Sequence, residues 1–161
     1  MALDVSRPDL TVGVIGTGAM GRGIVQVTAA GGMTVLMTDA RPGAAAEAKD
    51  FIGKMLDRAA EKGQMTKEEA VAATARIKIV DSHKDMRPCH VVIEAIVENL
   101  DAKRALLARV DEVRAGHAIA SSNTSGLPIA ALAEGRSEDF RRHWLGTHFF
   151  NPPRYLPLLE V

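Results

Sequence analysis

Apolar residues follow two patterns along the chain, short continuous runs and longer segments with an apolar position every three or four residues. The runs predict buried strands over residues 12–15, 33–38, 77–80, 90–96 and 118–121, and a last strand that reaches Phe150. The helical spacing predicts helices from a glycine-rich turn to about residue 30, and over 43–62, 67–75, 100–114 and 128–133. Strands and helices that alternate in this order predict an α/β fold with a doubly wound, mostly parallel sheet.

Local signals support the ends of these helices. Gly31-Gly32 and Gly63 follow two of them, and glycine commonly ends a helix. Thr66 and Glu69 have the spacing of a capping box, which predicts that a helix begins there. Polar residues follow several of the predicted strands, and the carboxyl ends of parallel strands are the places where such sheets bind ligands.

The chain has 161 residues, which is the size of one domain. We expect residues 1–9 to form a loose lead-in and residues 10–161 to form the domain. The sequence closes on the apolar run Leu158-Leu159-Glu160-Val161, without a polar tail. We therefore expect the chain to be a fragment of a longer polypeptide that continues into a second domain.

Composition argues against several classes of protein. Lys plus Arg and Asp plus Glu each total 20, so the net charge gives no reason to expect nucleic acid or an anionic membrane as a partner. Cys89 is the single cysteine, so we expect no intrachain disulfide and no metal site, and we place this residue in the core. A leader segment and a long apolar run are not found, which predicts a soluble, cytoplasmic protein.

The segment Val12–Ile24 joins a short strand to the pattern Gly16-x-Gly18-x-x-Gly21. Gly16 permits a tight turn, Gly18 lets the backbone approach a pyrophosphate, and Gly21 lets the next helix pack closely on the strand. The free N–H groups at the start of that helix attract phosphate. A second strand follows, and the whole unit predicts a Rossmann-type site for a dinucleotide.

The end of the second predicted strand indicates which dinucleotide binds. Asp39 lies 23 residues after Gly16, close to the spacing of the acid that binds a ribose 2′-hydroxyl. A carboxylate repels a 2′-phosphate, so we predict NAD as the cofactor. Arg41 supports the alternative, because a nearby arginine can accept the 2′-phosphate of NADP.

Further motifs resemble the L-3-hydroxyacyl-CoA dehydrogenase family. They are Ser122-Asn123-Thr124-Ser125, His148-Phe149-Phe150-Asn151-Pro152, Val97-Glu98-Asn99 and the glycine segment with Met20 at its centre. The resemblance extends from about Thr11 to Val161. The segment 144–155 is most similar to the large bacterial fatty-acid oxidation proteins of this family.

The resemblance implies that His148 is the catalytic base and that Glu160 is its partner. This agrees with the chemistry, because a base must take the hydroxyl proton of a secondary alcohol while hydride leaves the same carbon. It also implies that Ser125 and Asn151 bind the substrate oxygen, although serine and asparagine are common in turns for structural reasons. The other four histidines are interpreted as surface or structural residues.

The resemblance also assigns residues to the cofactor side of the site. It implies that Met20, Glu98 and Lys103 contact the cofactor, whereas the simpler interpretation of the last two is a charged pair at a helix start. It leaves two readings for Lys54 and Lys62, which either meet the phosphates of coenzyme A or belong to a solvated helix face.

The family's reaction is the oxidation of an L-3-hydroxyacyl-CoA to the 3-oxoacyl-CoA with hydride transfer to NAD, in fatty-acid β-oxidation. Members carry a helical C-terminal domain that dimerises and covers the acyl-CoA, so the parent protein is expected to be a homo-oligomer through that domain. Because the domain is absent here, we expect the chain to bind NAD but to turn over acyl-CoA weakly. Two alternatives remain open, a non-catalytic NAD-binding or redox-sensing module and a dehydrogenase of a free hydroxy acid.

Overall fold

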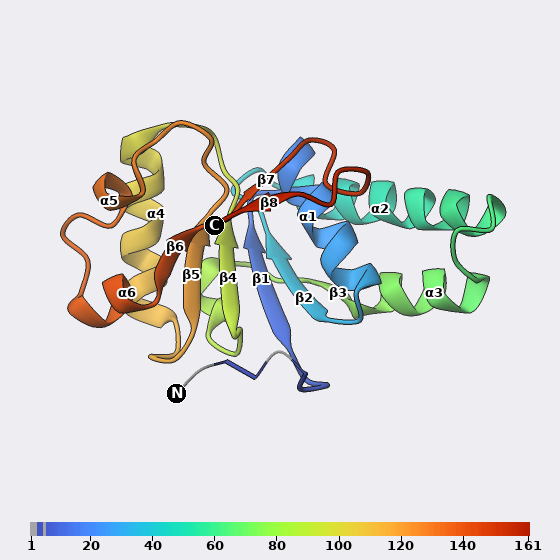
Figure 1. The fold of residues 1–161 in the computed structure, drawn as a ribbon, viewed down its shortest axis with the longest axis horizontal. Coiled ribbons are helices and arrows are strands. Elements are labelled where there is room, and N and C mark those ends of the chain that lie inside the picture. Colours follow the sequence, from blue (N-terminus) through green and yellow to red (C-terminus); the bar gives the residue numbers. More distant parts are fainter. Residues whose placement is uncertain (1–2, 5) are drawn as a thin grey trace.

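A six-stranded sheet forms the centre of the protein, in a computed structural model that describes residues 3, 4 and 6–161. Its strands are all parallel and lie in the order β3-β2-β1-β4-β5-β6 (Figure 1). The strands are β1 (Thr11–Ile15), β2 (Thr34–Thr38), β3 (Ile77–Ile79), β4 (Val91–Glu94), β5 (Ile119–Ser122) and β6 (Trp144–Gly146). The strand order reverses between β1 and β4, and the predicted doubly wound, Rossmann-type fold is confirmed. The lead-in predicted for residues 1–9 falls partly outside the described residues.

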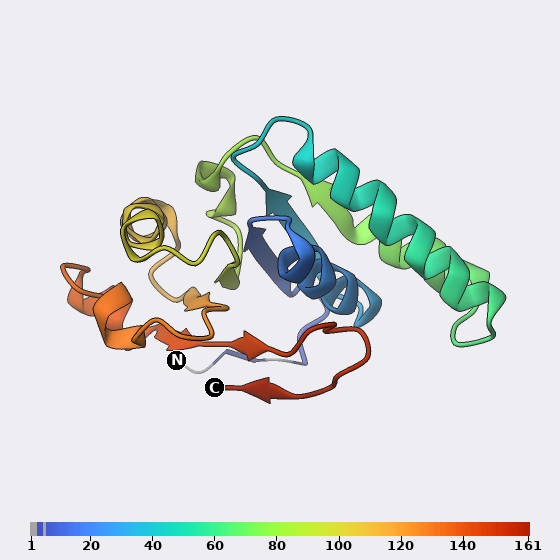
Figure 2. The ribbon, with the colours of Figure 1, turned by 90° about the horizontal axis from the view of Figure 1, so that it is seen from above.

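Helices cover both faces of the sheet (Figure 2). One face carries α1 (Ala19–Ala30), α2 (Ala44–Glu61) and α3 (Lys67–Arg76). The other carries the 3₁₀ helix η1 (His83–Met86), α4 (Leu100–Val113), α5 (Ile129–Leu132) and α6 (Glu138–Arg142). The antiparallel pair α2 and α3 extends away from the sheet, as all three ribbon views show.

The two faces have separate apolar cores, because successive residues of a strand point to opposite sides. In β1, Val14 belongs to the core under α1 and α2, and Ile15 belongs to the core under α4. In β4, Ile93 and Val92 divide in the same way. Cys89 lies in the second core, as predicted, and burial raises the pKa of its thiol to about 12.

The structure differs from the predicted elements at the short helices η1 and α6 and at the end of the chain. The prediction of one last strand that reaches Phe150 is wrong. Strand β6 ends at Gly146, and a separate strand β7 (His148–Phe149) pairs antiparallel with β8 (Leu159–Glu160). The helices η1 and α6 were not predicted. Each has a capping serine as its sequence signal, Ser82 before η1 and Ser137 before α6.

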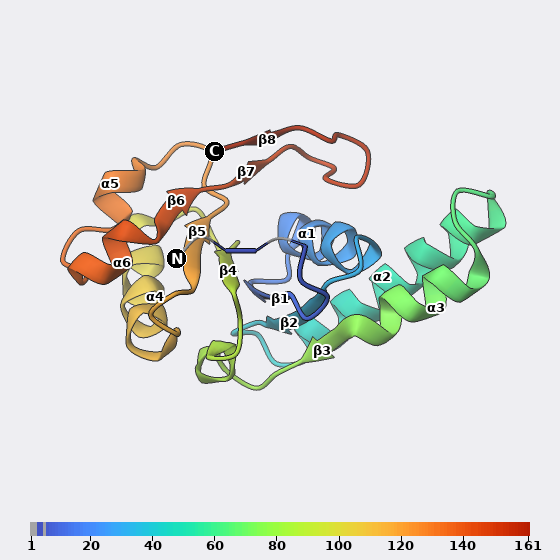
Figure 3. The same cartoon turned by 60° about the horizontal axis from the view of Figure 1, so that its bottom comes forward.

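The hairpin of β7 and β8 lies against α1 (Figure 3). A Cβ atom added to Gly23 of α1 would lie 2.8 Å from Cδ of Pro153, in the loop of the hairpin. The helix that follows the glycine turn therefore also supports the segment that carries His148.

Within the described part of the chain, no helix is long and apolar enough to cross a membrane. Over the same residues, no three His, Cys, Asp or Glu side chains gather in a group that could hold a metal ion.

Candidate active site

The carboxyl ends of five strands form one row across the sheet. The register pairs Ile15 with Thr38 on one side and with Glu94 on the other, Glu94 with Ser122, and Ser122 with Gly146. The glycine turn, Asp39, the segment 95–99, the segment 123–126 and His148 all follow this row along the chain. The prediction that the polar motifs meet at the carboxyl edge of the sheet is confirmed.

Three glycines shape the turn between β1 and α1, and the structure gives them different tasks. Gly16 has a positive φ of 97°, and a Cβ there would lie 2.6 Å from the carbonyl oxygen of Ala95. A Cβ on Gly21 would lie 1.9 Å from the carbonyl oxygen of Gly16. A Cβ on Gly18 would meet nothing within 4 Å. The fold therefore requires Gly16 and Gly21, whereas Gly18 keeps its backbone open at the start of α1.

Asp39 joins the end of β2 to the glycine turn. Its Oδ2 accepts hydrogen bonds from the backbone N and from Oγ1 of Thr17, at 2.7 and 2.8 Å, and its Oδ1 accepts one from the backbone N of Arg41. Burial alone would raise the pKa of Asp39, but these hydrogen bonds and the charge of Arg41 outweigh it and hold the pKa below its usual value. Asp39 is therefore a carboxylate next to the turn at neutral pH.

Arg41 is occupied by another acid. Its Nη2 lies 2.6 Å from Oε2 of Glu47, and Nη1 donates a second hydrogen bond to the same carboxylate. The exposed pair leaves the guanidinium directed toward α2, which weakens the argument for Arg41 as a 2′-phosphate ligand.

A cavity of about 560 Å³ brings most of the predicted site residues together. Its lining includes Gly18, Met20, Glu98, Lys103, Ser125, His148 and Asn151. Asp39 and Arg41 do not line it, and neither do Gly16, Gly21 and Glu160. The turn residue predicted to approach a pyrophosphate and the predicted catalytic base thus share one cavity.

His148 and Glu160 face each other across the β7–β8 hairpin. They are direct partners in the register, and Nδ1 of His148 lies 2.7 Å from Oε2 of Glu160. The chain reverses between them in a loop that contains Asn151-Pro152-Pro153. Because Oε2 of Glu160 accepts a hydrogen bond from Nδ1 of His148, Nε2 is the ring nitrogen available for proton transfer.

Glu98 and Lys103 are more than a charged pair at a helix start. Lys103 is only 1% exposed, and its Nζ lies 2.6 Å from Oε1 of Glu94 and 3.3 Å from Oε2 of Glu98. Glu98 accepts hydrogen bonds from the hydroxyl of Thr124 and from the backbone N of Ser125. Burial would raise the pKa of Glu98, but the hydrogen bonds from Thr124, Lys103 and the backbone N of Gly126, together with the charge of Lys103, lower it.

Comparison with known proteins identifies the family. The family described as "3-hydroxyacyl-CoA dehydrogenase, NAD binding domain" matches residues 11–161. The chain belongs to this family. The cofactor of the domain is accordingly NAD.

The relatives are longer proteins. The "Probable 3-hydroxyacyl-CoA dehydrogenase" of Bacillus subtilis is 38% identical over 164 residues, which cover 92% of this chain and 21% of the relative. The "Fatty acid oxidation complex subunit alpha" of Pseudomonas paraeruginosa is 36% identical, over 98% of this chain and 22% of the relative. This 3-hydroxyacyl-CoA dehydrogenase domain therefore spans about a fifth of the length of these two relatives.

Solved structures agree with the computed one. The 3-hydroxybutyryl-CoA dehydrogenase of Escherichia coli superposes with a TM-score of 0.89 at 34% identity, over 94% of this chain and 32% of the other. The (S)-3-hydroxybutyryl-CoA dehydrogenase of Ralstonia eutropha gives 0.87 at 36% identity, over 92% of this chain and 52% of the other. Both similarities extend over more than nine-tenths of this chain and support the same family.

The dehydrogenase domain has the features that NAD requires. The open backbone at Gly18, at the start of the 12-residue helix α1, suits the pyrophosphate. The ionised Asp39 at the end of β2 suits the adenosine ribose. The cavity that Gly18 lines also extends to Glu98 and His148.

Three polar residues of the site were missed in the sequence. Glu94 and Ser122 are the last residues of β4 and β5, and they are 1% and 0% exposed. Asn123 accepts a hydrogen bond at Oδ1 from the backbone N of Phe149, 2.9 Å away, and so joins the β5 loop to the strand of His148. A carboxylate within the apolar run Val91–Ile96 was the signal that could have identified Glu94.

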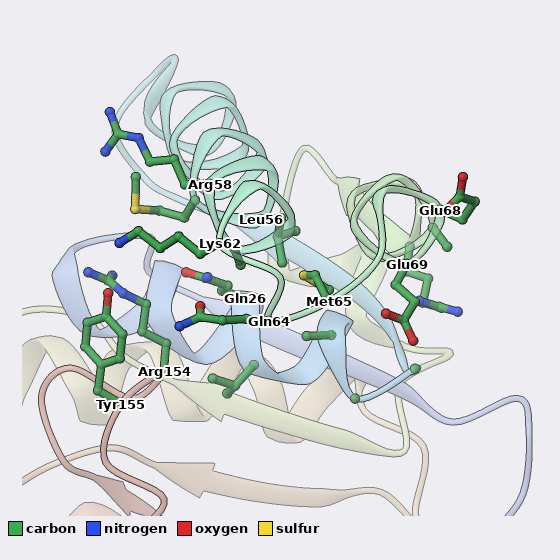
Figure 4. A pocket seen from close by; sticks show the side chains of 18 residues that line it. Gln26, Leu56, Arg58, Lys62, Gln64, Met65, Glu68, Glu69, Arg154 and Tyr155 are labelled. Carbon is green, nitrogen blue, oxygen red and sulfur yellow. The ribbon is translucent and has the colours of Figure 1, made fainter.

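A second cavity, of about 940 Å³, lies between α1, the α2–α3 pair and the hairpin loop (Figure 4). Lys62, Arg58 and Arg154 line it, and Arg154 also donates a hydrogen bond to Tyr155 and lowers the pKa of that phenol. Lys54 does not line it. The two lysines considered for coenzyme A are therefore in different positions, and of the two it is Lys62 that lines this cavity.

Proposed function

We propose that this domain carries out the oxidation of an L-3-hydroxyacyl-CoA to the 3-oxoacyl-CoA, with NAD as the hydride acceptor, in fatty-acid oxidation. The observation that carries the proposal is the shared cavity, which both Gly18 and His148 line. A domain that only bound NAD would not require an imidazole held by a carboxylate in that position.

The proposed chemistry assigns the proton to His148. When bound, NAD would accept the hydride of the alcohol carbon, and Nε2 of His148 would take the hydroxyl proton. The hydrogen bond at 2.7 Å from Nδ1 to Glu160 keeps the reactive tautomer and stabilises the imidazolium that forms. In the reverse direction the same imidazolium returns the proton to the 3-oxo group.

Two residues of the cavity are proposed to hold the substrate. Ser125 and Asn151 line the cavity with His148, and their polar groups suit the hydroxyl oxygen of the substrate. Glu98 accepts a hydrogen bond from the backbone N of Ser125, which fixes the position of this residue. The reacting carbon would then be held between His148 and the cofactor.

The substrate is proposed to be a thioester of coenzyme A, whose phosphates carry negative charge. The names of the relatives support this class of substrate. Positively charged side chains line the second cavity and could bind the phosphates of coenzyme A; they are Arg58, Lys62 and Arg154.

The test measures NADH oxidation by the chain with acetoacetyl-CoA and, separately, with acetoacetate. We expect slow but measurable turnover of the thioester and none of the free acid. His148→Ala should lower the rate by about 10²–10⁴, the usual contribution of a general base, with NADH binding retained. His117→Ala is the matched control, because His117 is exposed and does not line the cavity.

Three results would contradict the proposal. Turnover of acetoacetate at the rate of the thioester would favour a hydroxy-acid dehydrogenase. Unchanged turnover in His148→Ala would show that His148 is not the catalytic base. NADH binding without any turnover by the wild-type chain would favour the non-catalytic module.

A further inference from the structure

A buried polar network lies directly beneath the cavity. Its members are Glu94, Lys103 and Ser122, which are 1%, 1% and 0% exposed. Oε1 of Glu94 accepts hydrogen bonds from Nζ of Lys103 at 2.6 Å and from the backbone N of Ile96 at 2.7 Å. Its Oε2 accepts one from Oγ of Ser122. Both carboxylate oxygens are thus used, one toward α4 and one toward β5.

The network continues into the loop that follows β5. Oγ of Ser122 accepts a hydrogen bond from the backbone N of Thr124 at 3.2 Å. The hydroxyl of Thr124 donates a hydrogen bond to Oε1 of Glu98, and the same oxygen accepts a hydrogen bond from the backbone N of Ser125. Oε2 of Glu98 forms an ion pair with Nζ of Lys103. The contacts therefore form a closed ring through Glu94, Ser122, Thr124, Glu98 and Lys103.

A buried ring of charged and polar side chains contributes little to the stability of the folded protein. A buried ion pair loses its hydration, and apolar side chains of similar volume are often as stable or more so. Its fully satisfied hydrogen bonds do fix geometry, because each member has a single low-energy position. The ring positions the two segments 95–98 and 123–126, and most residues of the first, together with Asn123 and Ser125 of the second, line the cavity.

We propose that Glu94 and Ser122 are positioning residues for the nicotinamide half of the dinucleotide. Neither side chain lines the cavity, so both act through Glu98, Lys103 and the loop that carries Ser125. Glu94 holds Lys103, and Ser122 holds the amide of Thr124, so that Glu98 is kept beside the cofactor and Ser125 beside the substrate in one arrangement. The inference rests on the proposed function only in placing the nicotinamide in this cavity.

The test compares NADH with ADP-ribose, which lacks the nicotinamide, by isothermal titration calorimetry. Ser122→Ala removes the hydroxyl, keeps the Glu94–Lys103 pair and touches no ligand. We expect its Kd for NADH to rise about tenfold, the effect of one hydrogen bond to a charged group, while its Kd for ADP-ribose stays within twofold. A residue with a purely structural role would leave the ratio of the two constants unchanged.

Ser121→Ala is the matched control. Ser121 is the neighbouring residue of β5, 1% exposed, and its Oγ accepts a hydrogen bond from Thr147 instead of joining the ring. It should lose stability much as Ser122→Ala does, with no change in the ratio. Glu94→Gln should raise the ratio at least as much as Ser122→Ala, and thermal unfolding shows whether this second variant is folded.

The outcomes are distinct. An unchanged ratio in folded Ser122→Ala, or equal changes in Ser121→Ala and Ser122→Ala, would overturn the inference and leave the proposed function standing. Equal affinity of the wild-type chain for NADH and ADP-ribose would instead overturn the placement of the nicotinamide, and with it the proposed function.

Discussion

A substitution at Gly18 can test cofactor binding without disturbing the fold. In Gly18→Ala the added methyl group would meet no protein atom within 4 Å, and the backbone φ of −63° is one that alanine adopts readily. The methyl group would occupy the space over the first N–H groups of α1, where the pyrophosphate is expected. The variant should therefore fold normally and bind NADH poorly.

The expected change in stability is close to zero. Replacing glycine lowers the entropy of the unfolded chain and stabilises the protein by about 0.4–1 kcal/mol. Gly18 is also the N-cap of α1, where alanine is less favourable than glycine by a similar amount. The net free energy of unfolding should shift by less than about 0.5 kcal/mol, while NADH affinity should fall at least tenfold, about 1.4 kcal/mol.

Gly21→Ala is the contrasting variant. Its Cβ would clash with the carbonyl oxygen of Gly16, 1.9 Å away, and this oxygen belongs to the backbone and cannot turn aside as a flexible side chain could. Overpacking of this kind costs about 1–3 kcal/mol or more, so this variant should lose stability as well as affinity.

The assay is urea unfolding for the free energy and calorimetry for NADH binding, on the same preparations. If Gly18→Ala bound NADH as tightly as the wild type, the pyrophosphate would not lie on this turn. If it unfolded like Gly21→Ala, glycine would be required at position 18 by the fold, and the argument from open space would be wrong.

Three further predictions concern cofactor choice, acid stability and the hairpin. NADH should bind at least tenfold more tightly than NADPH in calorimetry, since the Asp39 carboxylate repels a 2′-phosphate and Glu47 occupies Arg41; tighter NADPH binding would reverse the assignment. The pKa of Asp39 is lowered in the folded state, so its stabilising contribution is present above about pH 4 and is lost as the pH falls through the folded value. Urea titrations should accordingly show the stability gap between wild type and Asp39→Asn narrowing in acid, and a constant gap would argue against the ionised carboxylate. Gly23→Ala should displace Pro153, 2.8 Å from the new Cβ, and lower turnover more than ADP-ribose affinity; equal losses would place the effect in α1 alone.

The central sheet was predictable because local patterns determine it. The runs that became β1, β2 and β4 are mostly apolar and rich in β-branched residues, and the register then follows from the alternation of their two buried faces. The capping box at Thr66 and Glu69 formed as predicted, since both its hydrogen bonds lie within one turn.

The site was only partly predictable, because its contacts join residues far apart in the sequence. Glu94 reaches Lys103 nine positions away and Ser122 28 positions away, and neither spacing belongs to a helix or strand period. The last strand was predicted as one because Trp144–Phe150 is rich in strand-forming residues. The chain instead leaves the sheet at Thr147, whose backbone N donates its hydrogen bond to Ser122.

The most direct test of the account follows the imidazole resonances of the chain by NMR during titration with NADH and with ADP-ribose. The account predicts that NADH shifts the resonances of His148 with the same Kd as the amide of Gly18, whereas ADP-ribose shifts Gly18 and leaves His148 unmoved. The exposed His117 should respond to neither. A His148 signal that does not respond to saturating NADH would contradict the claim that the glycine turn and the base serve one cavity.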